Sequence, residues 1–170
     1  GAKNSTTAFS TGSTEITSIG AVTVSGQEIP PDGTTAQRTI SSVNDKMTFA
    51  DNSTVTVTNA SGGSYGCFLV QSVRLSDGTL YSIVKVQDSG TIDVQVTTGS
   101  KFEVVTPSAI VGVRGTEFTV ATSDNGSEIG YQTVVTQTAG IVVVTDRETG
   151  NVSTLETSGT RSTTTGDVPL

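Results

Sequence analysis

Residues 101–120 read KFEVVTPSAIVGVRGTEFTV, and this stretch decides how the chain folds. Three apolar, β-branched segments are separated first by Thr106-Pro107 and then by Arg114-Gly115. Proline has no backbone N–H to donate to a sheet and so ends a strand, whereas glycine permits a positive φ where the chain changes direction. The stretch therefore predicts three short strands, with a break at Pro107 and a corner at Gly115.

The arginine at this corner stands out in a chain whose charged residues make up 15% of the sequence, against roughly 25% in soluble domains. A guanidinium that leaves water needs partners for its five donors. Loop carbonyls, or the carboxylate of Glu103 or Glu117, would supply them. We therefore predict that Arg114 clamps the corner and does not catalyse; binding of a ligand anion is the alternative. The predicted structural corner comprises Pro107, Arg114, Gly115, Thr116 and Phe118.

The rest of the chain has the composition and spacing of a β-protein. Serine and threonine account for 21 and 32 of the 170 residues, and threonine is β-branched, which favours strands. Residues 46–60 are typical of a hairpin, and residues 65–75 are expected to pair with residues 80–86. Further strands recur about every ten residues. We predict a single all-β domain of about ten or more short, mostly antiparallel strands, arranged as a sandwich or as stacked sheets.

Composition divides the chain into three parts. Residues 1–15 are low in complexity and hold one large apolar side chain, so we expect an extended N-terminal arm. The β-domain is expected over residues 16–160, and residues 161–170 form a polar tail. Ends with so little apolar surface are ordered only where something ties them down, and a neighbouring copy of the chain is one candidate. The predicted subunit contacts are Phe9, Ile16 and Ile19.

Charge and residue types exclude several classes of function. The formal net charge of −7 and the scattered lysines and arginines oppose binding to a nucleic-acid backbone. No apolar run approaches the roughly 18 residues of a membrane helix. The chain has no histidine, which rules out Ser-His-Asp and Cys-His catalysis and the common zinc sites. Residues 123–128 contain Asn-Gly, which favours a hairpin turn over a calcium site. We predict no enzyme activity, no cofactor and no metal site.

Five of the six asparagines lie in N-x-S/T sequons, which indicates an exported protein that carries glycans. A chance consequence of the high threonine content is the alternative. The candidate sites are Asn4, Asn52, Asn59, Asn125 and Asn151. We expect an extracellular or cell-surface protein whose signal peptide has been removed. Cys67 is the single cysteine, so no disulfide forms within the chain, and a buried thiol is favoured over a bridge between subunits.

Residues 101–120 also resemble the signature of the FecR domain family, in which a strand leads into Thr-Pro, a short apolar run, Val-Arg-Gly-Thr and a strand that contains Phe. The flanks agree: MTFADNSTVTVTNA resembles the family's early hairpin, and QTVVTQTAGIVVVTDRETGNVSTLETSG resembles its closing hairpin. The resemblance covers about residues 46–160. It implies a non-enzymatic β-domain. FecR-like proteins are best known as membrane-anchored regulators that relay a signal from an outer-membrane receptor to a sigma factor, and FecR-like domains also occur in exported proteins without that apparatus.

Two functions from different classes follow from these observations. We expect an extracellular structural protein that self-assembles into a homopolymer, as a pilus-like filament subunit joined by strand addition from the N-terminal arm. The alternative is a monomeric periplasmic FecR-like module for binding or signalling. The state of assembly of the chain distinguishes the two.

Overall fold

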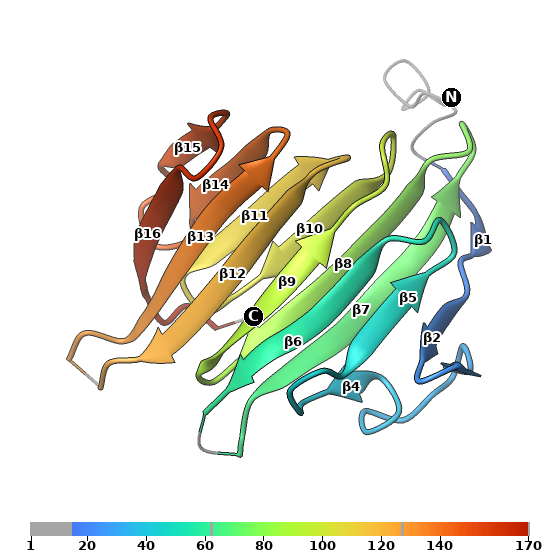
Figure 1. The fold of residues 1–170 in the computed structure, drawn as a ribbon, viewed down its shortest axis with the longest axis horizontal. Coiled ribbons are helices and arrows are strands. Elements are labelled where there is room, and N and C mark those ends of the chain that lie inside the picture. The colour runs from blue at the N-terminus through green and yellow to red at the C-terminus, as the bar shows by residue number, and fades with distance from the viewer. Residues whose placement is uncertain (1–14, 62, 127, 170) are drawn as a thin grey trace, which may run out of the picture.

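The computed structural model describes residues 15–61, 63–126 and 128–169. Within these ranges the chain forms strands, turns and loops without a helix, and two eight-stranded sheets pack face to face (Figure 1). The predicted all-β fold of mostly antiparallel strands is confirmed. Sheet A contains β1 (Ile16–Ile19), β4 (Thr39–Ile40), β7 (Gly66–Leu75), β8 (Leu80–Gln87), β10 (Lys101–Val105), β11 (Ala109–Arg114), β14 (Val142–Asp146) and β15 (Val152–Leu155). Sheet B contains β2 (Val22–Val24), β3 (Gln27–Glu28), β5 (Lys46–Phe49), β6 (Thr54–Ala60), β9 (Gly90–Gln95), β12 (Glu117–Asp124), β13 (Tyr131–Ala139) and β16 (Arg161–Gly166).

The chain crosses repeatedly between the two sheets. Sheet A has the order β1-β7-β8-β10-β11-β14-β15, with β4 also paired to β7, and sheet B has the order β16-β13-β12-β9-β6-β5-β2-β3. The pairing of β8 with β10 is parallel because β9, which separates them in the sequence, lies in the other sheet. Each outer face is therefore assembled from strands that are far apart in the sequence.

The corner at Gly115 is one of these crossings, from β11 in sheet A to β12 in sheet B. Gly115 has a φ of +70°, and a Cβ there would lie 2.6 Å from the Cα of Thr98. Any side chain would be strained and would collide with the neighbouring turn. Beyond the glycine, the hydroxyl of buried Thr116 donates to the carbonyl of Ala139, and Phe118 enters the core. The glycine is what lets one stretch of sequence supply strands to both sheets.

The core lies between the sheets and is rich in valine. Alternate residues of each strand point inward, as in β11, where Ala109, Val111 and Val113 are buried. The rings of Phe49 and Phe102 meet between the two sheets, with centroids 5.2 Å apart and planes at 83°, in the edge-to-face arrangement that aromatic pairs favour. Removal of these apolar side chains from water is the main source of stability.

The two ends of the described chain pair with strands of the same molecule. β1 pairs with β7, and β16 pairs with β13 from Tyr131 opposite Gly166 to Thr136 opposite Arg161. Residues 161–166, which composition assigns to a polar tail, therefore form an edge strand of sheet B. Backbone hydrogen bonds order this polar segment without requiring apolar side chains. A neighbouring copy of the chain is not needed to hold it.

Candidate functional site

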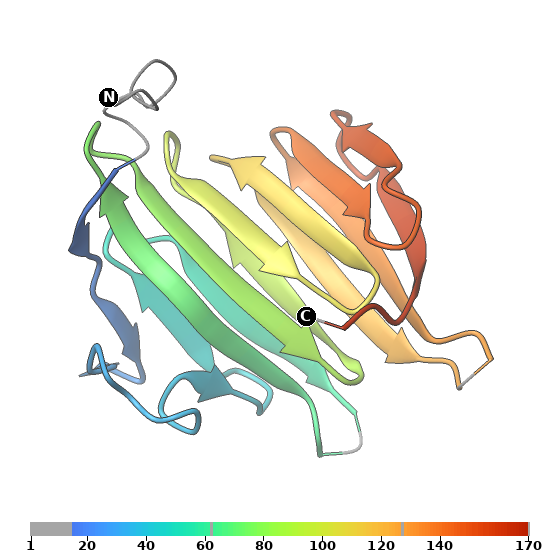
Figure 2. The same cartoon turned by 180° about the vertical axis from the view of Figure 1, so that it is seen from behind.

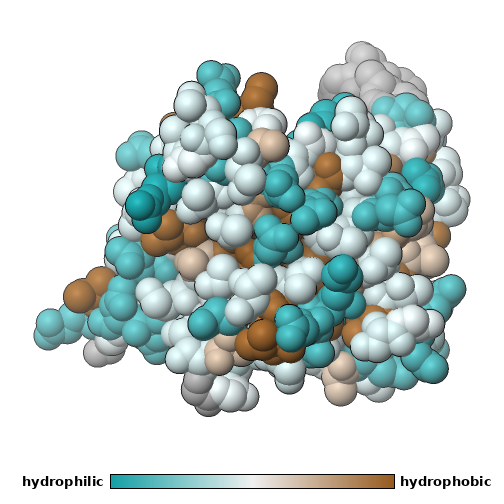
Figure 3. Space-filling model, viewed as in Figure 1, coloured by the Kyte–Doolittle hydropathy of each residue, from teal (hydrophilic) through white to brown (hydrophobic). Residues whose placement is uncertain are grey.

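The outer faces of the two sheets differ in chemistry. Outward positions of sheet B are mainly threonines and charged residues, as on β6, where Thr54, Thr56 and Thr58 alternate with Val55 and Val57, which are buried. Figure 3 shows this side of the molecule as mostly white and teal, with brown confined to small separate groups. Such a face is well hydrated and offers little apolar surface to a partner.

The outer face of sheet A, which is turned to the viewer in Figure 2, is more apolar. Large apolar side chains that are exposed and lie on or beside its strands are Ile16, Ile19, Val70, Ile110, Ile141, Val143 and Val152. Among the residues that the structure describes, no exposed large apolar side chain lies on a strand of sheet B, and the two in loops next to it are Val43 and Ile129. Exposed aliphatic groups are thus concentrated on one face of the sandwich, which we call the apolar face.

The sequence carries a signal for this face. Strands of sheet A contain consecutive apolar residues, as in AIVGV at 109–113 and IVVV at 141–144, whereas sheet B alternates, as in TVTVT at 54–58. Strict alternation indicates one polar face, and a continuous run indicates apolar side chains on both faces. These runs serve only to locate strands in the sequence, and they do not tell which of their residues point outward. Gly112 and Val143 are therefore missing from the predicted site.

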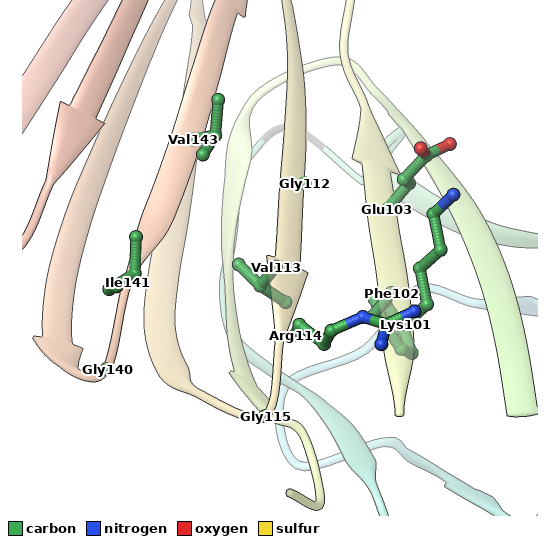
Figure 4. Close-up of a pocket in the computed structure, with 10 residues that line it drawn as sticks. All are labelled: Lys101, Phe102, Glu103, Gly112, Val113, Arg114, Gly115, Gly140, Ile141 and Val143. Atoms are coloured by element: carbon green, nitrogen blue, oxygen red, sulfur yellow. The ribbon is translucent and has the colours of Figure 1, made fainter. Parts of the chain in front are cut away.

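A groove crosses the apolar face over β10, β11 and the start of β14 (Figure 4). Its volume is about 640 Å³, and its lining includes Lys101, Glu103, Gly112, Ile141 and Val143. Glu103 and Val143 flank Gly112 in register from the two neighbouring strands. A Cβ added at Gly112 would meet no atom within 4 Å, so the absent side chain leaves the groove open.

An aromatic and charged cluster borders the groove on the side of β8. The hydroxyl of Tyr81 donates a 2.8 Å hydrogen bond to Glu103, and the ammonium group of Lys101 lies 4.5 Å from the centroid of the Tyr81 ring. Partial burial, and after it the hydrogen bond to Glu103, raises the pKa of Tyr81. The hydroxyl therefore stays protonated at neutral pH and fixes the carboxylate. The cluster presents a cation, a ring and a fixed carboxylate, which is an arrangement suited to recognition.

Arg114 lies at the groove and is exposed at the end of β11. Among the described residues, the arginines whose guanidinium groups donate hydrogen bonds are Arg38, Arg74 and Arg147, and Arg114 is not one of them. In Figure 4 its side chain extends beside Lys101, its register partner on β10. The loop carbonyls and carboxylates expected to accept hydrogen bonds from Arg114 do not do so in the described part of the chain. The alternative, binding of an anion, is compatible with this position.

A different arginine ties the Thr-Pro turn in place. Nη1 of Arg147 donates to the carbonyls of Thr106 at 2.9 Å and Val168 at 2.7 Å, and Nη2 donates to the carbonyl of Pro169 at 2.8 Å. The backbone N–H of Val168 in turn donates to the carbonyl of Pro107 at 2.9 Å. These bonds join the β10–β11 turn to the C-terminal segment. Only tertiary structure brings Arg147, which lies in a distant turn of the sequence, to this corner.

The remaining predicted site residues lie away from the groove. Phe9 and Asn4 fall outside the described residues. Ile16 and Ile19 are exposed on β1, whose backbone pairs with β7 of the same chain. The sequon asparagines that the structure describes are exposed, as glycan attachment requires: Asn52, Asn59, Asn125 and Asn151. Glycosylation itself stays a prediction.

Cys67 is fully buried on β7. Burial raises the pKa of its thiol from 9.0 to about 12, so no thiolate forms at neutral pH. This environment agrees with a buried thiol and not with a bridge between subunits. The described ranges hold no group of three or more His, Cys, Asp or Glu residues placed to bind a metal ion. They also contain no helix that is long and apolar enough to cross a membrane.

No curated protein matches the chain. Two crystal structures, at 1.65 and 2.50 Å resolution, are similar to it, and both are of a protein named "putative anti-sigma factor" from Parabacteroides distasonis ATCC 8503. Each is 20% identical to this chain with a TM-score of 0.48, and the similarity covers 76% of this chain and 60% of the other. The chain therefore spans about three-fifths of the length of these structures.

The family model described as FecR protein matches residues 35–135, which is more than half of the 170 residues. The matched range begins and ends earlier than the predicted 46–160, and it includes the whole of residues 101–120. The resemblance drawn from the Thr-Pro and Val-Arg-Gly-Thr motifs is confirmed.

The family match contradicts the prediction of a self-assembling structural protein. A pilus-like filament subunit joined by a donor strand, with copies of itself as partners, does not fit a family of regulatory modules, whereas the alternative of a binding or signalling module does. The polar segment that suggested a neighbouring copy is held within the molecule, where β16 pairs with β13. Because the FecR model matches residues 35–135, more than half of the chain, the chain belongs to the FecR family.

Proposed function

We propose that this FecR-family chain is a non-enzymatic regulatory module that works as a monomer outside the cytoplasm and binds a protein partner through its apolar face. The observation that carries the proposal is the difference between the two outer faces of the sandwich. Sheets A and B share one core and one chain, so folding alone does not require the strands of one outer face to carry exposed large aliphatic side chains when those of the other carry none. A binding role explains the difference.

The pattern on the apolar face resembles the anatomy of a protein interface. Ile110 and Val143 are exposed on β11 and β14, and Lys101 and Arg114 lie at one end of the β10–β11 pair. Protein interfaces combine a desolvated apolar centre with a polar rim in which arginine is frequent. The groove is open along the sheet and is not an enclosed cavity, which suits a segment of a protein better than a small molecule.

Two features support a location outside the cytoplasm. The four described sequon asparagines are all exposed, at positions where a glycan would not disturb the core. The single thiol is buried and protonated, so the chain has no reactive cysteine to mispair in an oxidising compartment. FecR-like domains known from the family also lie outside the cytoplasm.

Two matched substitutions test the proposal in the cells that make the protein. Val143→Asp places a charge on the apolar face, and Val134→Asp places the same charge on the outer face of sheet B, between Ala121 and Thr163. We expect Val143→Asp to change the transcript profile in the same way as deletion of the gene. We expect Val134→Asp to leave the profile as in the wild type. Equal urea midpoints for the two purified variants verify that both fold.

A deletion that leaves the transcript profile unchanged would contradict the regulatory role. A profile altered by Val134→Asp and not by Val143→Asp would move the partner surface to sheet B.

A further inference from the structure

Two cationic residues occupy opposite positions of neighbouring strands at one end of the groove. Lys101 and Arg114 are register partners on β10 and β11, and like charges at opposite positions destabilise a sheet. Lys101 gains some compensation from the ring of Tyr81, 4.5 Å away. Arg114 is exposed, and within the described ranges it is not among the arginines that donate a side-chain hydrogen bond. The juxtaposition is also unusual in a chain with a net charge of −7. A bound anion would remove the repulsion and satisfy the donors of the guanidinium.

The chain's own carboxylates near this end are engaged elsewhere. Glu103 accepts the hydrogen bond from Tyr81, on the side of β8. Asp77 is exposed in the β7–β8 turn, where a backbone hydrogen bond from Thr79 first, and the charge of Arg114 at longer range, lower its pKa. Neither carboxylate forms a salt bridge with Arg114. A ligand anion would therefore meet a guanidinium that neither of these carboxylates binds directly.

Aliphatic side chains line the groove on the other side of β11, toward β14 (Figure 4). Ile141 is 54% exposed and Val143 is 36% exposed, and both line the groove. Between them and β10 lies the open space above Gly112. A ligand that fits the whole groove thus combines a carboxylate with an aliphatic group.

The spacing along β11 selects an extended peptide. Arg114, Gly112 and Ile110 point to the same side of the sheet, and alternate residues of a strand are about 7 Å apart. An extended segment laid along β11 presents its own alternate side chains at the same interval. One side chain of the bound segment then reaches Lys101 and Arg114. The side chain two positions further along the segment enters the space above Gly112 and contacts Val143.

We infer that the groove binds an extended segment of a partner protein that carries an acidic residue and, two positions away, an aliphatic one. This inference rests on the proposed function and specifies the chemistry that the apolar face recognises. Lys101 and Arg114 hold the carboxylate, and Gly112 makes room for the aliphatic side chain. The chain's first 14 residues contain a lysine and no acid, so they lack the complementary charge.

A peptide titration of the 15N-labelled chain tests this inference. The probe is the peptide acetyl-Thr-Ser-Glu-Ser-Val-Ser-Thr-amide at low salt, and the control is the same peptide with Gln in place of Glu. We expect amide shifts on β10, β11 and β14, with a dissociation constant of about 1 mM or tighter. The Gln peptide should bind at least about tenfold more weakly, because it loses the charge-assisted hydrogen bonds.

Two variants of the protein separate charge from shape. Lys101→Gln with Arg114→Gln should weaken binding at least about tenfold, whereas Lys46→Gln with Arg161→Gln, which removes the same charge from exposed positions on sheet B, should not change it. Gly112→Val fills the open space with a residue that favours strands, so it should keep the fold and abolish binding. Thermal unfolding of each variant verifies that it folds.

Four results would overturn the inference: shifts confined to sheet B, no shifts at millimolar peptide, equal affinity for the Glu and Gln peptides, or equal binding of free isovalerate, which would indicate a small-carboxylate site. If Val143→Asp alters transcription while the Lys101→Gln, Arg114→Gln variant binds the peptide normally, the proposed function stands and this inference fails.

Discussion

Arg147, from the turn after β14, contacts the segment that precedes β11, and Arg114 is the last residue of β11. The two arginines have different roles: Arg147 ties the structure together, and Arg114 is exposed. The guanidinium of Arg147 donates to Thr106, Val168 and Pro169, so its replacement by alanine leaves carbonyls without a partner. We expect Arg147→Ala to lower the free energy of unfolding by about 1.5–3 kcal/mol. Arg114→Ala should change it by less than about 0.5 kcal/mol, because the side chain is exposed. Urea denaturation measures both, and a larger loss for Arg114→Ala would contradict this assignment.

Two buried ionisable side chains, Cys67 and Tyr65, are expected to make the free energy of unfolding fall at alkaline pH. Burial raises the pKa of Cys67 from 9.0 to about 12, and burial, followed by the nearby Cys67, raises the pKa of Tyr65 above its ordinary 10.0. Both groups are neutral when protonated, and the unfolded chain loses these protons at lower pH than the folded chain does. Their contribution is therefore complete below about pH 9 and is lost as the pH rises through the range between the unfolded and folded values.

Urea midpoints measured from pH 7 to 11 check this expectation. We expect a constant midpoint up to about pH 8.5 and a decline above pH 9, with a shallower decline in Cys67→Ala. A midpoint that stays flat or rises across the alkaline range would show that these side chains are not buried as described.

At the scale of elements, β16 is an integral part of sheet B. It pairs with β13 along its length, and Thr164 is buried against Ser108, whose hydroxyl lies 2.6 Å from that of Thr133. Ending the chain after residue 160 should lower the free energy of unfolding by at least about 2 kcal/mol, because the edge of β13 loses its partner and this hydroxyl cluster is opened to water. Ending it after residue 166 keeps β16 but removes Val168 and Pro169, the acceptors of Arg147, so the difference between the two truncations measures the contribution of β16. Equal losses for the two truncations would contradict the integral role of β16.

The strands themselves could be predicted, and their partners could not. Residues 65–75 and 109–113 coincide with β7 and β11 because alternation and turn residues are local properties of the sequence. The parallel pairing of β8 with β10, and the pairing of polar β16 with β13, depend on which strands cross between the sheets. The apolar face escaped prediction for the same reason: Gly112 and Val143 become neighbours only when β14 pairs with β11. Register, and not composition, creates the groove.

The whole molecule is expected to be a monomer. Every strand from β1 to β16 pairs within the chain, so assembly through a donated strand is not needed to complete either sheet. Light scattering coupled to size exclusion should give the 17.3 kDa of one chain, plus the mass of any glycans in native material. A concentration-independent polymer would contradict the account. Apolar contact between copies, if present, would appear as a dimer that Val143→Asp dissolves.

The outer face of sheet A is the proposed partner surface. A photo-crosslinking amino acid placed at Val143, and in a second variant at Val134 on the opposite face, tests this in the cells that make the protein. We predict a discrete adduct with a different protein from position 143, which disappears when Ile110→Asp is added, and no such adduct from position 134. Adducts from position 134 alone, or the same adducts from both positions, would contradict the claim.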